Sequence, residues 1–197
     1  PRFIRQGFSN LSFLGIQQPG GGFVDETAAR GVRFQETHSD PALVDSDGDG
    51  DLDLSLTCIY EGVPSALFQN DGAGRFTPIT FRAGAVAFHG WGQAWLDFDG
   101  DGFLDVVYAS DAGVRAFRNS GNENHWVRVA LQGKGRDPSG FGAVVRVQGT
   151  EEGAPPPLLR QLINARGTSS QDEPVLHFGL GAYAGRLRIE VTWPDTD

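Results

Sequence analysis

Two nine-residue segments hold the residues of this chain that are best suited to chemistry. Residues 45–53 read DSDGDGDLD and residues 97–105 read DFDGDGFLD, so aspartates recur at the first, third, fifth and ninth positions of both. A glycine stands at the sixth position of each. Closely spaced carboxylates repel one another unless a cation neutralises them, and alternating oxygen ligands around a glycine turn are typical of a calcium loop. We name these segments loop 1 and loop 2, and predict one Ca²⁺ ion in each.

The predicted ligands follow from their positions in the loops. The first, third and fifth aspartates each contribute one side-chain oxygen, the ninth binds through both carboxylate oxygens, and the seventh residue contributes its backbone carbonyl. We expect structural rather than catalytic ions, because protein atoms fill the coordination shell, and Mg²⁺ prefers a smaller octahedral shell. The predicted ligands of loop 1 are Asp45, Asp47, Asp49, Asp51 (carbonyl) and Asp53, and those of loop 2 are Asp97, Asp99, Asp101, Phe103 (carbonyl) and Asp105.

An EF-hand is the nearest alternative explanation of the two loops. It needs a bidentate glutamate at position twelve and a helix on either side. Position twelve is Leu56 in loop 1 and Tyr108 in loop 2, and both loops lead into alternating, strand-like sequence. The other alternative is an empty, solvated acidic turn, which the mutual repulsion of the carboxylates disfavours. The spacing therefore favours a strand-bounded loop that the ninth aspartate closes.

Composition predicts an all-β protein. The chain has 197 residues with 28 glycines and 11 prolines, and no stretch keeps a helical period, which favours short strands joined by glycine-rich turns. Nine of the 25 acidic residues lie in the two loops, and two Ca²⁺ ions would cancel four charges of the formal net charge of −9. A nucleic-acid partner is excluded because phosphate binding needs a basic face. No apolar run is long enough to span a membrane.

The sequence around the loops repeats, and loop 2 begins 52 residues after loop 1. Each loop follows a short apolar lead and precedes an alternating strand, and a second strand then ends in an asparagine, Asn70 or Asn119. A further strand is expected at 75–80, with its counterpart one unit earlier at 22–27, preceded by residues 2–6. A strand-rich period of 40 to 60 residues is typical of a β-propeller blade.

The repeat predicts a partial β-propeller of about two and a half blades at residues 1–122. A closed propeller takes at least about four blades, so we expect missing upstream residues or another chain to supply the rest. From residue 124 the repeat stops, and five strand-like runs follow at 125–131, 141–148, 158–164, 175–178 and 186–193. The last run alternates apolar and polar residues, which predicts one face in a core and one in water. We therefore predict a β-sandwich at 123–197, called the tail below.

The remaining reactive residues indicate no enzyme. Cys58 is the only cysteine, so no intrachain disulfide can form, and we expect it to be a small buried side chain. His89 precedes loop 2 as His38 precedes loop 1, which favours packing or hydrogen bonding within each repeat. Trp91, Trp95 and Trp126 can stack on sugars if exposed, but their strand positions favour packing. With the metal ligands assigned, no catalytic constellation stands out.

At this point the sequence resembles two known families. Residues 23–27 and 90–105 resemble FG-GAP/VCBS-type calcium-binding propeller repeats. The tail resembles the ASPIC/UnbV domain, named for acidic cartilage proteins and bacterial relatives, in four motifs that keep their order: NHW at 124–126, GFGA at 140–143, LHFGLG at 176–181 and VTWPD at 191–195. The resemblance implies secreted or surface proteins with calcium-stabilised propellers that serve binding or adhesion. It supplies no catalytic residue.

These observations together predict an extracytoplasmic interaction or adhesion module, which is extracellular, on the cell surface or periplasmic, where calcium is plentiful. We expect it to dock on other protein chains or to self-assemble in a surface or matrix assembly. The alternative is a carbohydrate-binding or carbohydrate-processing accessory domain. The sequence begins at Pro1, contains no methionine and shows no signal peptide, so we expect a processed or partial product.

Overall fold

Strands dominate the computed structural model, which describes residues 12–32, 38–133, 138–163, 165–167 and 170–194. In these residues fourteen strands form five antiparallel sheets, accompanied by one short helix. The predicted all-β class is confirmed. No helix in the described ranges is long and apolar enough to cross a membrane.

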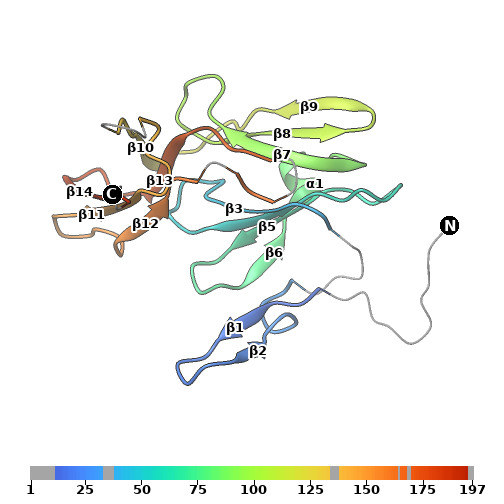
Figure 1. The fold of residues 1–197 in the computed structure, drawn as a ribbon, viewed down its shortest axis with the longest axis horizontal. Coiled ribbons are helices and arrows are strands. Elements are labelled where there is room, and N and C mark those ends of the chain that lie inside the picture. Colours follow the sequence, from blue (N-terminus) through green and yellow to red (C-terminus); the bar gives the residue numbers. More distant parts are fainter. Residues whose placement is uncertain (1–11, 33–37, 134–137, 164, 168–169, 195–197) are drawn as a thin grey trace.

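Two sheets carry the acidic loops, and in each of them consecutive strands pair side by side (Figure 1). The four-stranded sheet contains β3 (Pro41–Val44), β4 (Asp53–Leu56), β5 (Ala66–Asn70) and β6 (Phe76–Pro78). The three-stranded sheet contains β7 (Gly90–Leu96), β8 (Asp105–Ser110) and β9 (Gly113–Phe117). Loop 1 joins β3 to β4, and loop 2 joins β7 to β8, so the loops occupy equivalent places.

One hydrophobic core packs these two sheets against each other. Ala42 and Val44 alternate along β3 and meet Trp95 of β7 and Val106 of β8 in the same cluster. Tyr108 is fully buried there, and its hydroxyl lies 3.4 Å from the hydroxyl of a β4 serine. This shared core brings the ends of both sheets that carry the loops to the same side of the molecule.

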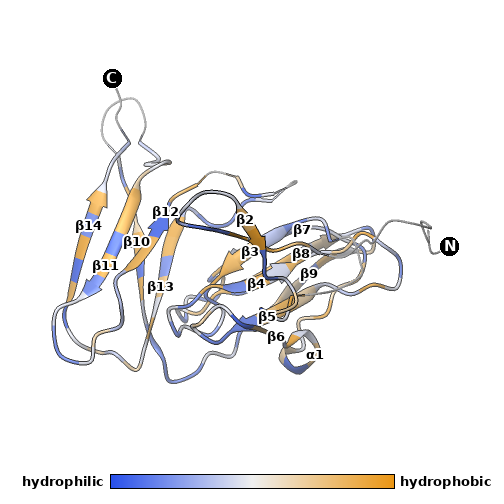
Figure 2. Ribbon diagram, turned by 90° about the horizontal axis from the view of Figure 1, so that it is seen from below, coloured by the Kyte–Doolittle hydropathy of each residue, from blue (hydrophilic) through white to orange (hydrophobic). Residues whose placement is uncertain are grey.

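The tail forms two further sheets around a separate core. One pairs β10 (His125–Ala130) with β13 (Val175–Gly181), and the other has the order β12 (Leu158–Gln161), β11 (Val144–Gly149), β14 (Leu187–Thr192). The tail strands lie together at one end of the molecule, apart from β3 to β9 (Figure 2). Alternate residues of β11 and β13 fill the core, where the side chains of Val145 and Phe178 are fully buried.

The structure corrects three details of the predicted elements. The strand expected at 75–80 ends at Pro78, and Thr80 begins the short helix α1 (Thr80–Ala83), which stops at Gly84 with φ of 73°. The strand expected at 175–178 continues to Gly181. The apolar face expected on the last strand is only partly buried, because Ile189 is 43% exposed and Trp193 is 45% exposed.

A separate hairpin precedes the loop-bearing sheets. It pairs β1 (Gly15–Gln17) with β2 (Phe23–Asp25), and β2 lies within the strand expected at 22–27. Residues 2–6, which precede that strand in the predicted repeat, lie outside the described residues. The backbone N–H of Phe76 in β6 donates to the carbonyl of Arg30 at 2.8 Å, so the residues after the hairpin contact the edge of the four-stranded sheet.

Candidate metal centres

Both loops fold around the same internal hydrogen bonds. The first aspartate accepts the backbone N–H of the sixth-position glycine, from Gly50 to Asp45 at 3.2 Å and from Gly102 to Asp97 at 3.0 Å. The two glycines have φ of 97° and 92°, a conformation that a side chain would strain. The glycine predicted to permit the turn therefore has that role in both loops.

The ninth aspartate closes each loop. Asp53 accepts the backbone N–H of the second residue of its loop at 3.2 Å and that of Asn70 at 2.8 Å. In loop 2, Asp105 likewise accepts the backbone N–H of the second residue at 3.0 Å and that of Asn119 at 2.6 Å. Both asparagine side chains also donate to the carbonyl just before that aspartate. Sequence analysis noted the repeated asparagines but assigned them no role, although their matching places were the available signal.

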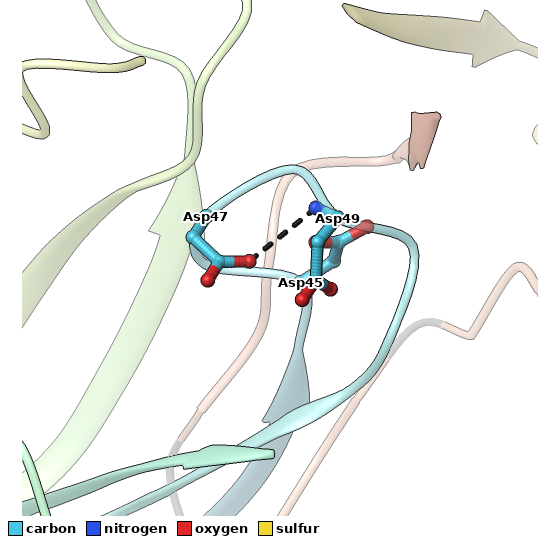
Figure 3. Close-up of side chains that lie close together, drawn as sticks. All are labelled: Asp45, Asp47 and Asp49. Atoms are coloured by element: carbon cyan, nitrogen blue, oxygen red, sulfur yellow. Dashed lines mark hydrogen bonds between the residues drawn. The ribbon is translucent and has the colours of Figure 1, made fainter. Parts of the chain in front are cut away.

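Three carboxylates gather in each loop. In loop 1, Asp45, Asp47 and Asp49 each place a carboxylate oxygen within 4.8 Å of the others (Figure 3). In loop 2 the corresponding group contains Asp97, Asp99 and the ninth-position Asp105. All six belong to the predicted ligand set, and their close approach suits a cation that binds several carboxylate oxygens.

The other predicted ligands lie outside these two groups. Both oxygens of Asp53 accept hydrogen bonds from Ser46 or Asn70. Asp101 accepts the backbone N–H of Phe103 at 2.9 Å, as Asp49 accepts that of Asp51. The carbonyls of Asp51 and Phe103 remain predicted ligands that no contact identifies. The phenyl ring of Phe103 is buried beside Gly48, so that the two loops touch.

Asp45 gives loop 1 the clearest cation-binding character. Its side chain is almost fully buried, and Oδ2 accepts backbone N–H groups from Gly50 and, at 2.8 Å, from Gly179 of the tail. The other oxygen, Oδ1, is buried and has no hydrogen-bond partner among the described residues. Burial raises the pKa of Asp45 to about 6. A buried, unpaired carboxylate oxygen is costly, and a bound cation would remove that cost.

Loop 2 differs because arginines contact its carboxylates. Arg128 of β10 lies 2.8 Å from Asp97 and 2.6 Å from Glu173, and Arg118 lies 2.9 Å from Asp99. In loop 1 an arginine, Arg160, donates to the carbonyl of the sixth-position glycine at 3.2 Å, rather than to an aspartate. Both loops have aspartates at the first, third, fifth and ninth positions, but the charges of these aspartates are compensated differently. The contacts of Arg128 and Arg160 could not be predicted from the loops, because these arginines lie 31 and 110 residues from their partners along the chain.

Several other candidate residues can now be placed. His89 has φ of 54° and lies 3.0 Å from the carboxylate of Asp111, within the three-stranded sheet as expected. Cys58 is fully buried, as predicted. Of the tryptophans, Trp95 is buried in the core, but Trp91 is 56% exposed, so the expectation of packing was wrong for Trp91.

Comparison with known proteins finds family matches for two overlapping segments of the chain, which together cover residues 97–197. Residues 97–145 match the family model described as FG-GAP-like repeat, and residues 133–197 match the one described as ASPIC and UnbV. Cartilage acidic protein 1 of Homo sapiens and that of Mus musculus are each 35% identical to this chain over 116 residues, which is 54% of this chain. The chain spans only 16% of the length of these relatives. It carries an FG-GAP-like repeat followed by an ASPIC/UnbV domain and is distantly similar to cartilage acidic protein 1.

Proposed function

We propose that this chain is a calcium-stabilised binding module of an extracytoplasmic protein, with one structural Ca²⁺ ion in each acidic loop and no catalytic role. The observation that carries the proposal is the buried Oδ1 of Asp45, which has no hydrogen-bond partner in the part of the chain that the structure describes, in a side chain grouped with Asp47 and Asp49. Loop 2 has the same backbone hydrogen bonds as loop 1, which supports a second ion there. Carboxylate oxygens are the hard ligands that Ca²⁺ prefers.

Thermal unfolding with and without calcium tests the metal proposal. A ligand that binds only the folded state raises Tm, so calcium should raise Tm and a chelator should lower it. Asp45→Asn should reduce the calcium-dependent gain by the contribution of loop 1. Glu152→Gln, which makes the same change of charge at an exposed residue outside the loops, should keep the full gain. A Tm that neither calcium nor the chelator changes would exclude the proposal.

The geometry also supports a propeller-like arrangement of the repeats. β3 to β6 and β7 to β9 are antiparallel sheets of sequential strands, they share one core, and their metal loops lie at equivalent turns. These are features of successive propeller blades. We propose that the two sheets are blades, that the β1–β2 hairpin belongs to a neighbouring blade, and that the tail sheets form a sandwich.

We further propose that protein surface, from another part of the polypeptide or from another chain, covers the exposed hairpin. Phe13 is 69% exposed and Phe23 is 68% exposed, and exposed apolar groups of this size favour protein contacts. Size-exclusion chromatography with light scattering tests self-assembly. Phe23→Ser should shift the protein toward monomer if the hairpin mediates association, whereas a wild-type protein that is monomeric at every concentration would exclude self-assembly.

Carbohydrate binding is the second candidate, because Trp91 and Trp126 are 56% and 38% exposed. Exposed indole rings can stack on sugar rings. A glycan panel screened with and without calcium separates the two candidates. Saturable binding that Trp91→Ala abolishes would favour the carbohydrate candidate, and the absence of binding would leave the protein-binding module.

A further inference from the structure

One strand of the tail contacts both metal loops. Along β13, Leu176, Phe178 and Leu180 are buried in the core of the tail. The alternate residues contact the loops instead. His177 Nε2 donates to the carbonyl of Gly102 in loop 2 at 2.8 Å, because a carbonyl can only accept. The backbone N–H groups of Gly179 and Gly181 donate to loop 1, to Asp45 Oδ2 at 2.8 Å and to the Gly48 carbonyl at 2.9 Å.

Gly179 shows how close this approach is. Its φ lies outside the left-handed region, so the backbone conformation alone would accept a side chain. A Cβ atom on Gly179 would, however, lie 2.4 Å from Asp45 Oδ2 and 2.4 Å from the carbonyl carbon of Gly48. The glycine is therefore needed because the tail backbone lies directly against loop 1.

The contact also determines which oxygen of Asp45 is left for a cation. Gly179 and Gly50 both donate to Oδ2, and this arrangement leaves the buried Oδ1 without a partner. At loop 2, Arg128 of β10 contacts Asp97, and the Trp126 indole lies where a Cβ on Gly102 would be. The backbone donors that orient Asp45 in this way raise the affinity of loop 1, because less order has to be imposed on binding.

We propose that β13 of the tail is a positioning element for both metal loops, so that calcium binding and the docking of the tail are coupled. The proposal rests on the calcium binding proposed above. Coupling is reciprocal, so calcium should hold the tail on the loops, and a docked tail should raise the calcium affinity by the same factor. The tail then contacts each loop on the side that faces away from the sheet to which the loop belongs.

Calorimetric titration of the full chain with Ca²⁺ tests the coupling. The wild-type chain should bind two ions, and Gly179→Ala should weaken binding at loop 1 at least tenfold. Gly20→Ala is the matched control, because its new Cβ meets no atom within 4 Å, and it should bind like the wild type. If the wild type binds no calcium, the proposed function fails. If Gly179→Ala is folded and binds like the wild type, the coupling alone fails.

Hydrogen exchange tests the same proposal without any substitution. Calcium should slow amide exchange in peptides that cover β13, whose N–H groups at 179 and 181 donate to loop 1. Peptides that cover β14 should exchange at an unchanged rate, because that strand pairs within the tail. If calcium binds and β13 exchanges as fast with it as without it, the two events are independent and the coupling is wrong.

Discussion

Three features of its surroundings act on the charge of the Asp45 carboxylate. Its burial disfavours the charged form, two backbone N–H groups on Oδ2 favour it, and Oδ1 has no partner. Burial is the largest effect on its pKa, which is raised from 3.8 to about 6. The metal-free folded state is therefore disfavoured as the pH rises from about 4 to about 6, and a cation at Oδ1 would reverse that penalty.

The raised pKa predicts a pH-dependent calcium affinity at loop 1. Below pH 6, Asp45 must lose its proton before it can bind Ca²⁺, so the affinity should fall by about tenfold between pH 7 and pH 5 for this one carboxylate. Titration calorimetry at pH 5, 6 and 7 measures the change. Asp45→Asn disables loop 1, so the binding event that depends on pH in this way should be absent from that variant. An affinity of loop 1 that is equal at pH 5 and pH 7 would contradict the prediction.

Residue spacing was enough to find the carboxylates but not their partners. The positions of Asp45, Asp47 and Asp49 within one loop could be predicted, because the interactions that gather them are local. The donor from Gly179 could not, because it lies 134 residues away along the chain. Glycine usually weakens a strand, and the predicted strand ends at Phe178. The observed strand includes Gly179 and Gly181, which are the two glycines that contact loop 1.

At the scale of elements, the two loops have the same backbone hydrogen bonds but differ in the ion pairs that their carboxylates make. Both follow the first strand of a sheet, and both are closed by the ninth aspartate and an asparagine. Arg118 follows β9 and lies 2.9 Å from Asp99, whereas the carboxylates of loop 1 have no ion pair within 4.0 Å among the described residues. An arginine at a ligand opposes a divalent cation, so loop 1 should bind calcium more tightly than loop 2.

Removing that arginine should strengthen loop 2. In an Asp45→Asn background, which isolates loop 2, Arg118→Gln should raise its calcium affinity by about two- to fivefold. The effect is small because the Arg118 side chain is 59% exposed and solvent screens the pair. Arg115→Gln, on β9 just before Arg118 and without an ion pair within 4.0 Å in the described structure, is the matched control. Equal or weaker binding after Arg118→Gln would show that the pair does not compete with the ion.

At the scale of the whole molecule, one arginine joins three units. Arg166 of the tail donates to the Pro41 carbonyl in β3 and to the Gln93 carbonyl in β7, each at 3.1 Å. It also makes two bonds to Asp172, at 2.8 and 2.9 Å, and lies 3.5 Å from the fully buried Asp40. The tail therefore contacts the sheets both at the metal loops and at the free edge of β7. The change from repeat to tail composition is visible in the sequence, but this contact could not be predicted from it, because no local pattern marks Arg166.

The contact predicts that the sheets and the tail unfold together. Arg166→Ala leaves Asp40 buried without its cation, so it should lower the free energy of unfolding by about 3 kcal/mol or more. Arg166→Lys keeps the charge but loses the planar fork, and should fall between the alanine variant and the wild type. Arg186→Ala, at a side chain that is 88% exposed, should cost less than about 1 kcal/mol.

Urea unfolding followed by tryptophan fluorescence reports on both parts, because Trp95 lies in the sheets and Trp126 in the tail. If Arg166→Ala were as stable as Arg186→Ala, the other contacts between the two parts, such as the bond from the Trp95 N–H to Asp172 at 2.8 Å, would be enough to hold them together, and the prediction would be wrong.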